Sequence, residues 1–423
     1  MTLTGSEIFC EVLVEQGVDT LFGYPGGAVL NLYDALYKYQ DRIRHIITAH
    51  EQGAAHAADG YARATGRTGV VLATSGPGAT NLVTGIATAY MDSIPMVAVT
   101  GNVPNSLMGQ DSFQEVYIAG ITMPITKHNF VVDKVENLAD ILREAFRIAQ
   151  TGRKGPVLVD IPKDVTAASC SFSPAAPARD EYRTVIDGSA IDQAAEIINA
   201  AERPVVYYGG GVVASGAGDL LSRLMHKACI PGAYSLMAAG VVSSEDPLCL
   251  GMVGMHGCRT SNVAFDQADV MIAVGTRFSD RVALAPDEFG RRAKLIQIDI
   301  DPSEVNKNVL VDVSLMGDVK DIIQALLPKI NTSVHQPWLD AIMKLKEEDY
   351  YPDDSETSLK PHQVIRKICD MTGDDAIVVT DVGQHQMWAA QYVRHLKPRH
   401  FITSGGLGTM GFGYGAAIGA QMG

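Results

Sequence analysis

The chain has no apolar run that could cross a membrane, since no stretch approaches the ~18 consecutive apolar residues that such a helix needs. Its first residues, MTLTGSEIFCEVLVEQG, lack the basic start and the apolar core of a signal peptide and are typical of an amphipathic helix. Positive charge is scarce too, because 34 Lys and Arg stand against 48 Asp and Glu, for a net charge of −14. We therefore expect neither nucleic acid nor a membrane surface as a partner.

Cysteine pairs with a redox or metal-binding spacing are also absent. The six cysteines, which form no C-x-x-C pair, are Cys10, Cys170, Cys229, Cys249, Cys258 and Cys369. Such a pattern is typical of small buried thiols in a reducing compartment and predicts a cytoplasmic location. The histidines show no zinc spacing, and no Ser/His/Asp order indicates a hydrolase.

What the sequence does contain is a repeated alternation of short apolar runs with helical patterns. Within residues 1–165 the expected strands are 19–25, 44–49, 69–75, 95–101 and 155–162. The expected helices begin at Ala28, Glu51, Asn81 and Asn137. Continuous apolar strands between helices predict an α/β fold of successive doubly wound, mostly parallel sheets.

Two stretches of different composition divide the chain. Residues 171–183 are rich in Pro and Ala and then charged, and residues 331–358 are acidic with an exposed-looking helix around 338–348. Both are typical of linkers. The expected organisation is a first α/β domain, a linker, a second α/β domain, another linker and the start of a third α/β domain, at residues 1–165, 166–188, 189–330, 331–359 and 360–423.

Glu51 stands where a strand should end and a helix begin, in the segment HEQGAAHAADGYARATG. A carboxylate there points into the crevice at the carboxyl ends of the strands, where open parallel sheets bind ligands. Two interpretations stay open from position alone. Glu51 is either a helix N-terminal glutamate favoured by the helix dipole, worth ~0.3–1 kcal/mol, or a carboxyl with a raised pKa that shares a proton with a ligand nitrogen.

Several glycine turns lie between an expected strand and an expected helix. The turns at 23–30 and 75–81 match no phosphate-loop signature, so each alone indicates only a close backbone approach. The turn at 207–216 has three consecutive glycines, the arrangement that admits a pyrophosphate. Arg277 and Arg281 follow the next strong strand and suit anionic groups, although solvated arginines are the common alternative.

The third α/β unit contributes two loops, at 381–388 and 403–413. Gln384 and His385 can donate to phosphate oxygens, and the glycines of the second loop expose backbone amides. Met410 is either a core methionine or a hydrophobic support for a flat ring.

Together these motifs resemble the large, catalytic subunit of acetohydroxyacid synthase (acetolactate synthase), and the resemblance covers essentially the whole chain. The matching segments occur in the family's order: FGYPGGAVLNLYDAL, HEQGAAHAADGYARATG, ATSGPGATNL, QDSFQEV, GPVLVDIPKDV, GMHG, GTRFSDRV, GQHQMWAAQ and TSGGLGTMGFG. The resemblance implies a pyrimidine-binding domain, a central FAD-binding domain and the N-terminal part of a diphosphate-binding domain.

The resemblance also implies thiamine diphosphate, Mg²⁺ and a non-redox FAD as cofactors. The implied reaction decarboxylates pyruvate and transfers the two-carbon unit to a second 2-ketoacid, pyruvate or 2-ketobutyrate, in isoleucine and valine biosynthesis. The family implies a homodimer or homotetramer with sites at the subunit interface, and it admits a small regulatory subunit.

The resemblance assigns residues to each part of the implied site. For catalysis and substrate it implies Glu51 on the aminopyrimidine nitrogen, with Gly26, Gly27, Phe113, Gln114, Lys163 and Arg281. Around the thiamine cofactor it implies Pro77, Asn81, Gln384, His385, Gly408 and Met410. Around FAD it implies Arg153, Gly209, Gly210, Gly211, Met255, His256, Gly275, Arg277, Asp299, Ile300 and Asp318.

The chain departs from the family pattern in three places. Ser279 stands where the family commonly has Asp, and Tyr414-Gly415 where it commonly has Leu-Pro. The family's GDG…N segment, which holds Mg²⁺ and the diphosphate, would follow Gly423, so no metal ligand is assigned here and the chain by itself is expected to bind FAD and make little acetolactate. Two alternatives stay open: another thiamine-diphosphate enzyme, such as a pyruvate oxidase or 2-ketoacid decarboxylase, and a non-catalytic FAD-binding fragment.

Overall fold

The computed structural model describes residues 1–179, 182–348 and 357–423. These residues form two compact units. Unit 1 holds the described part of Met1–Glu181 together with Val379–Val382 and Ile402–Gly423, and unit 2 holds the described part of Tyr182–Val378 together with Gly383–Phe401. Both expected linkers extend into stretches that lie outside the described residues, 180–181 and 349–356.

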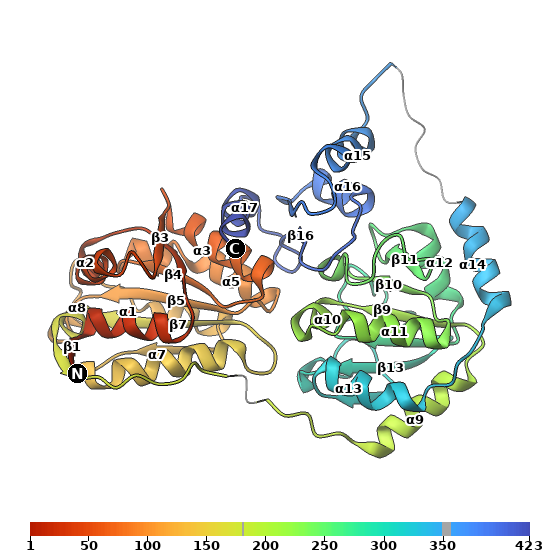
Figure 1. The fold of residues 1–423 in the computed structure, drawn as a ribbon, viewed down its shortest axis with the longest axis horizontal. Helices are drawn as coiled ribbons and strands as arrows, with labels where there is room; N and C mark the ends of the chain where they lie inside the picture. Colours follow the sequence, from red (N-terminus) through yellow and green to blue (C-terminus); the bar gives the residue numbers. More distant parts are fainter. Residues whose placement is uncertain (180–181, 349–356) are drawn as a thin grey trace. The chain divides into compact units, whose positions relative to one another are not determined.

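Unit 1 is built on a six-stranded sheet in which all neighbouring strands are parallel (Figure 1). In sheet order its strands are β3 (Arg44–Ile47), β2 (Thr20–Gly23), β4 (Gly69–Ala73), β5 (Met96–Asn102), β7 (Pro156–Pro162) and β6 (His128–Val131). The sequence predicted five of these strands. It missed β6, a half-exposed edge strand whose residues HNFV form no continuous apolar run.

Helices cover both faces of this sheet because successive strand residues point to opposite sides. One hydrophobic core lies under α1, α2 and α7, and the other lies under α3 and α5. The helices of this part are α1 (Gly5–Glu15), α2 (Leu30–Lys38), α3 (Glu51–Thr65), α4 (Pro77–Thr80), α5 (Val83–Met91), α6 (Ile118–Thr122), α7 (Val135–Gln150) and α8 (Lys163–Ala167), with short 3₁₀ turns η1 (Gly27–Val29), η2 (Asn105–Leu107) and η3 (Met123–Ile125). A small antiparallel pair joins β1 (Thr2–Thr4) to β8 (Ser169–Ser171).

The C-terminal helix α17 (Phe412–Met422) packs directly on α3 in unit 1. Small residues make this approach possible, because a Cβ at Gly60 or at Gly419 would collide with backbone atoms of the facing helix, at Ala416 and Ala57 respectively. Two short strands, β15 (Val378–Val379) and β16 (Phe401–Ile402), precede this helix and form a two-stranded sheet.

Unit 2 repeats the architecture with its own six-stranded parallel sheet. In sheet order the strands are β11 (Cys249–Met252), β10 (Gly232–Tyr234), β9 (Pro204–Tyr208), β12 (Val270–Val274), β13 (Lys294–Asp299) and β14 (Val313–Met316). The helices are α9 (Gly188–Ala200), α10 (Gly210–Ser215), α11 (Gly218–Ala228), α12 (Arg259–Gln267), α13 (Val319–Leu326), α14 (Gln336–Glu348), α15 (Pro361–Thr372) and α16 (Gln384–Tyr392), with 3₁₀ turns η4 (Leu236–Ala238), η5 (Pro302–Glu304) and η6 (Leu327–Lys329). The two parallel sheets confirm the predicted α/β class.

Helix α14 corrects one expectation. The sequence predicted an exposed helix in a linker, whereas Trp338 and Ile342 are buried with one face of the sheet of unit 2. The indole Nε1 of Trp338 donates to the carbonyl oxygen of Pro204 at 3.1 Å. The many charges on the other face of the helix hid this short apolar stripe in the sequence.

Among the described residues, no helix combines the length and the apolar character that a membrane crossing requires.

Candidate functional site

The strand order of unit 1 creates a topological switch point between β2 and β4. The chain leaves β2 toward β3 on one side and later continues from β4 toward β5 on the other. At such a switch point the loops after the two central strands diverge, which is where doubly wound sheets bind ligands. The structure brings Gly26 and Gly27 to this place after β2, and Pro77 and Asn81 after β4.

The two loops at the switch point touch each other. The backbone N–H of Ala28 donates to Thr74 Oγ1 at 3.2 Å, and a Cβ at Gly26 would collide with the Thr74 side chain. Gly26 is therefore required by local packing alone. Gly27 has open space where its Cβ would be, so its backbone is free to approach a ligand.

Glu51 is the first residue of α3, as the sequence predicted, and its side chain is buried at 7% exposure. The side-chain amide of Asn81 donates to Glu51 Oε2 at 2.9 Å. A Cβ at Gly78 would collide with Thr74 Cγ2 at 2.6 Å and would lie 3.3 Å from Glu51 Oε1, so close packing beside the carboxylate requires a glycine here. Burial first, and the charge of Glu51 second, raise the pKa of the nearby Tyr33 phenol.

The residues assigned to the substrate pocket lie near the same edge of the sheet, in loops after β5 and β7. Phe113 is 87% exposed, and Gln114 has a left-handed backbone with φ of 60°. Gln114 lies against Gly76, because a Cβ on Gly76 would be 2.8 Å from the Gln114 Cβ. Lys163 is the first residue of α8.

Arg153 lies elsewhere in unit 1, in the turn before β7, where its Nε donates to Ser93 Oγ at 2.9 Å. Its expected neighbours around FAD belong to unit 2. Within unit 1 the structure gives Arg153 a local partner, Ser93.

Gly408 and Met410 belong to unit 1, in residues 403–411 between β16 and α17. Gly408 has a φ of +66°, a conformation that L side chains rarely adopt. Met410 is 77% exposed, which contradicts the interpretation as a core methionine. An exposed apolar side chain on a glycine loop is free to support a ligand.

Unit 2 has its own switch point, between β9 and β12. The Gly209–Gly211 turn follows β9 and the Gly275 turn follows β12, and the two turns pack backbone against backbone. The N–H of Gly211 donates to Gly275 O at 2.8 Å, and a Cβ at either glycine would come within 2.8 Å of the other turn. This packing explains why positions 211 and 275 are glycine, and a Cβ at Gly210 would lie only 3.3 Å from the Met237 Cβ, so this position also has little room for a side chain.

Other residues assigned to FAD gather at the same edge of this sheet. Asp299 ends β13, Ile300 follows it, and Asp318 caps α13 after β14, where its Oδ1 accepts from Lys320 N at 2.8 Å. Arg277 follows the β12 turn, and its carbonyl oxygen accepts from Tyr207 Oη at 3.4 Å.

The GMHG and GTRFSDR segments meet in unit 2. The N–H of Met255 donates to the carbonyl oxygen of Arg281 at 2.8 Å, and Arg281 Nη1 lies 3.6 Å from Met255 Sδ. The Arg281 side chain is largely exposed, with Asp280 at 3.7 Å. The carbonyl of His256 accepts from the Gln391 amide at 2.8 Å.

Gln384 and His385 are the first two residues of α16 and are exposed. Their backbone amides lie at a helix N-terminus, which suits an anionic group. Within the described parts of the chain, no group of three or more His, Cys, Asp or Glu side chains is arranged to hold a metal ion.

Sequence reasoning missed two groups of buried polar residues in unit 1. One is the cluster of Asp59, Arg63 and Asp92, and the other is Asp160 with its donors Thr100 and Asn102. The i, i+4 spacing of Asp59 and Arg63 was visible, but such pairs are usually solvated. Nothing in the sequence indicated that Asp92 would join them.

Comparison with known proteins identifies the family of this chain. Three family descriptions match: the N-terminal TPP binding domain of thiamine pyrophosphate enzymes at residues 3–121, their central domain at 191–326, and their C-terminal TPP binding domain at 381–423. The chain is 46% identical to a probable acetolactate synthase large subunit of Methanocaldococcus jannaschii, over 99% of this chain and 73% of that protein.

Two further relatives have similar names. The chain is 48% identical to an acetolactate synthase of Mycobacterium bovis, over 99% of this chain and 70% of the relative. It is 44% identical to the acetolactate synthase isozyme 2 large subunit of Escherichia coli, over 99% of this chain and 76% of the relative. Relatives of this similarity, together with three thiamine pyrophosphate enzyme domains, show that the chain belongs to the family of acetolactate synthase large subunits.

Proposed function

We propose that this chain is part of an enzyme that decarboxylates pyruvate and transfers the two-carbon unit to a second 2-ketoacid, either pyruvate or 2-ketobutyrate. The observation that carries this proposal is the buried carboxylate of Glu51, placed at the switch point of the first sheet beside Asn81. Thiamine diphosphate, when bound, supplies the carbon nucleophile for this chemistry.

The residues at this switch point fit the aminopyrimidine end of that cofactor. Asn81 binds one carboxylate oxygen of Glu51, Oε2, and the other, Oε1, would share a proton with a ring nitrogen. The hydrogen bond from Asn81 fixes the orientation of the carboxylate. Pro77 would also lie near this ring, and Gly26 and Gly27 would line the thiazolium.

The remaining cofactor contacts are proposals of the same kind. Gln384 and His385 would meet the diphosphate at the start of α16, and Gly408 and Met410 would support the rings. The Mg²⁺ that neutralises a diphosphate is proposed as a cofactor without ligands assigned in this chain.

We place FAD on unit 2, where the donor set suits a dinucleotide. Its switch point combines the glycine turn at Gly209–Gly211 with Arg277 and the carboxylates of Asp299 and Asp318 at one edge of the sheet. We propose a non-redox role for FAD, so the absorbance of the oxidised flavin should persist during turnover. A pyruvate oxidase would instead bleach it.

The substrate contacts would come from Phe113, Gln114 and Lys163, and Arg281 would hold the carboxylate of the second ketoacid. We also propose a homodimer or homotetramer with sites at the subunit interface and a possible small regulatory subunit. The six free cysteines support a cytoplasmic location, and the proposed pathway is isoleucine and valine biosynthesis.

The variant Glu51→Gln tests the central proposal. It keeps the shape of the side chain but removes the proton-sharing carboxylate, so acetolactate formation at saturating cofactor should fall by ~10²–10⁴-fold. The matched control is Glu136→Gln, which neutralises another glutamate in the first turn of a helix, α7. If Glu51→Gln kept near-normal turnover, or if both variants lost activity equally, Glu51 would have only a helix-dipole role.

A further inference from the structure

A buried cluster of three charged side chains lies in unit 1, formed by Asp59 and Arg63 on α3 and by Asp92 at the end of α5. The Arg63 Nη2 atom donates to Asp92 Oδ2 at 2.8 Å and to Asp59 Oδ2 at 3.3 Å, and Arg63 Nε forms a short bond with Asp59 Oδ1. The side-chain exposures of Asp59, Arg63 and Asp92 are 0%, 6% and 1%.

One arginine faces two buried carboxylates in this cluster. Burial raises the pKa of Asp59, although the charge of Arg63 opposes the shift. Burial lowers the pKa of Arg63, but the charges of Asp59 and Asp92 outweigh this effect and the net shift is upward. Arg63 therefore stays charged, and the buried carboxylate oxygens that it does not bind need further hydrogen-bond donors.

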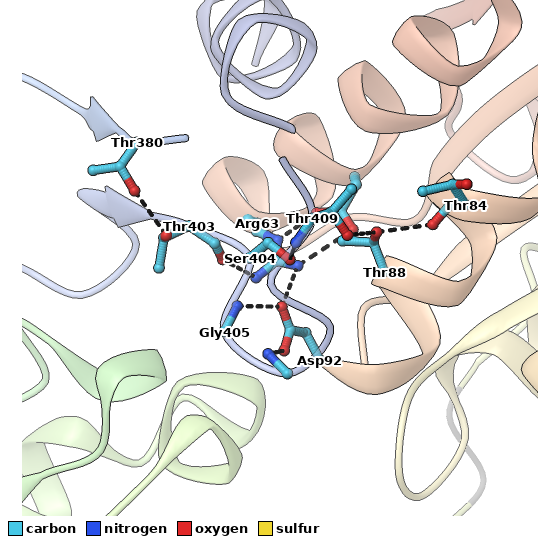
Figure 2. Close-up of polar contacts among 11 residues, drawn as sticks. Arg63, Thr84, Thr88, Asp92, Thr380, Thr403, Ser404, Gly405 and Thr409 are labelled. Atoms are coloured by element: carbon cyan, nitrogen blue, oxygen red, sulfur yellow. Dashed lines mark hydrogen bonds and ion pairs between the residues drawn. The ribbon is translucent and has the colours of Figure 1, made fainter. Parts of the chain in front are cut away.

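The additional donors come from residues 403–411, the segment that contains Gly408 and Met410. The backbone N–H groups of Gly405 and Gly406 donate to the Asp92 carboxylate at 3.1 and 2.6 Å (Figure 2). Arg63 Nη1 donates in turn to the carbonyl oxygen of Thr403 at 2.9 Å. Both signs of charge in the cluster thus bind the backbone of this one segment.

Neutral hydrogen bonds hold the same segment at a second point. The Thr409 hydroxyl lies 2.7 Å from the hydroxyl of Thr88 on α5, and the Thr409 N–H donates to Ser404 Oγ at 3.0 Å (Figure 2). A third contact, this time with a carboxylate, lies at the C-terminal end of the segment, where the Gly411 N–H donates to Asp381 Oδ1 at 2.9 Å.

The backbone of the segment is therefore held, while its longest side chain is not. Met410 remains 77% exposed between the anchored Thr409 and Gly411. A flexible glycine-rich loop would lose entropy on binding a cofactor, and a loop anchored in advance avoids that cost.

We propose that Asp92 and Arg63 are positioning residues that pre-organise residues 403–411 for the cofactor through a buried ionic anchor. This inference rests on the proposed function, because it takes Gly408 and Met410 to contact thiamine diphosphate. Asp92 is the central member, since it alone binds both Arg63 and two peptide groups of the segment.

The variant Asp92→Asn tests the proposal. Its amide nitrogen cannot accept a hydrogen bond, so at least one of the N–H groups that now donate to the Asp92 carboxylate would lose its acceptor. Hydrogen exchange read by mass spectrometry should become at least about tenfold faster in peptides covering 403–411, and the KM for thiamine diphosphate should rise by about tenfold while kcat at saturating cofactor falls less. The matched control is Glu15→Gln, which removes a largely buried carboxylate that also binds an arginine, Arg143, and a backbone N–H, that of Ala175. It should leave both readouts unchanged.

A second variant covers the case in which Asp92→Asn does not fold. Thr88→Val removes the hydroxyl that bonds Thr409 and that also donates to the carbonyl oxygen of Thr84 within α5, while it leaves the charged cluster intact, and it should produce a smaller change of the same kind. A folded Asp92→Asn protein with unchanged exchange, or with faster exchange but unchanged cofactor KM, would overturn the inference. Failure of the wild-type protein to bind thiamine diphosphate would instead overturn the proposed function, and the exchange comparison would still report on the anchor.

Discussion

At the scale of single residues, Asp160 is the clearest example of chemistry that burial controls. It lies on β7 at 2% exposure, and its carboxylate accepts hydrogen bonds from Thr100 Oγ1 at 2.7 Å and from Asn102 Nδ2 at 2.5 Å. Burial raises the pKa of this carboxyl to about 6, although both hydrogen bonds oppose the shift. Neutral donors are therefore not enough to offset the desolvation of the charge.

This shift predicts how Asp160 affects stability with pH. Because the folded pKa lies above the unfolded one, the folded state binds the proton more tightly, so stability is lost as pH rises from about 4 to about 6. The variant Asp160→Asn has no carboxyl at this position to titrate, so its stability should not fall for this reason. The difference in unfolding free energy between variant and wild type should therefore grow by up to about 3 kcal/mol across this window.

Denaturant unfolding of both proteins at several pH values measures this difference. Burial lowers the pKa of His56 and of His395 to about 4, so both also make stability depend on pH in this range. Because both proteins contain these histidines, their contribution cancels in the difference between variant and wild type. A difference that stays constant from pH 4 to 7 would show that Asp160 titrates normally in the folded protein.

At the scale of elements, the contact between α3 and α17 depends on glycine more than on large side chains. A Cβ at Gly60 would collide with the backbone of Ala416, whereas a Cβ at Gly53, on the same helix, meets nothing within 4 Å. The same substitution at these two positions therefore separates helix propensity from packing.

We predict that Gly60→Ala lowers the thermal midpoint and that Gly53→Ala does not. Overpacking against backbone typically costs ~1–3 kcal/mol, while alanine in place of a helical glycine gains ~0.5–1 kcal/mol where space allows. Differential scanning fluorimetry of the two variants checks the prediction. Equal shifts of the midpoint would show that α17 does not stay packed on α3 in solution.

At the scale of the whole molecule, the two units use the same architecture for different proposed ligands. In each, the glycine turns follow the two strands at the switch point, β2 and β4 in one and β9 and β12 in the other. Whether a complete site also needs a second copy of the chain is a separate question. The exposed side chains of Met410 and Tyr414, at 77% and 82%, favour a partner that covers them.

Mixed oligomers test the proposed subunit-interface site. If Glu51 of one chain works with Met410 of another, co-expressed Glu51→Gln and Met410→Ala chains should form mixed dimers with about half of the wild-type activity, since one site per dimer is intact. Each variant alone should be nearly inactive.

The reciprocal control uses the double variant with the wild-type chain. A site shared between chains then leaves no intact site in the mixed dimer, while a site within one chain leaves one. Activity only in this second mixture would place the site within a single chain and contradict the proposal.

The sequence by itself determined five of the six strands of the first sheet and the position of Glu51. Strands β2, β4, β5 and β7 are nearly continuous apolar runs because they are buried on both faces, and such runs are visible without a structure. The start of α3 at Glu51 follows from the change between strand and helix patterns. The long motifs then carried the resemblance to acetolactate synthase large subunits, which the comparisons confirmed.

Only the tertiary structure decided which polar groups meet. Asn81 reaches Glu51 across 30 positions, and Asp92 reaches Gly405 across 313, because strand order and helix packing bring these positions together. The tertiary structure also showed that Gly211 and Gly275 pack against each other, where neither leaves room for a side chain on the other, and that Trp338 belongs to a hydrophobic core. Local patterns report which face of an element is buried, but pairing between distant residues depends on the path of the whole chain, which no local pattern contains.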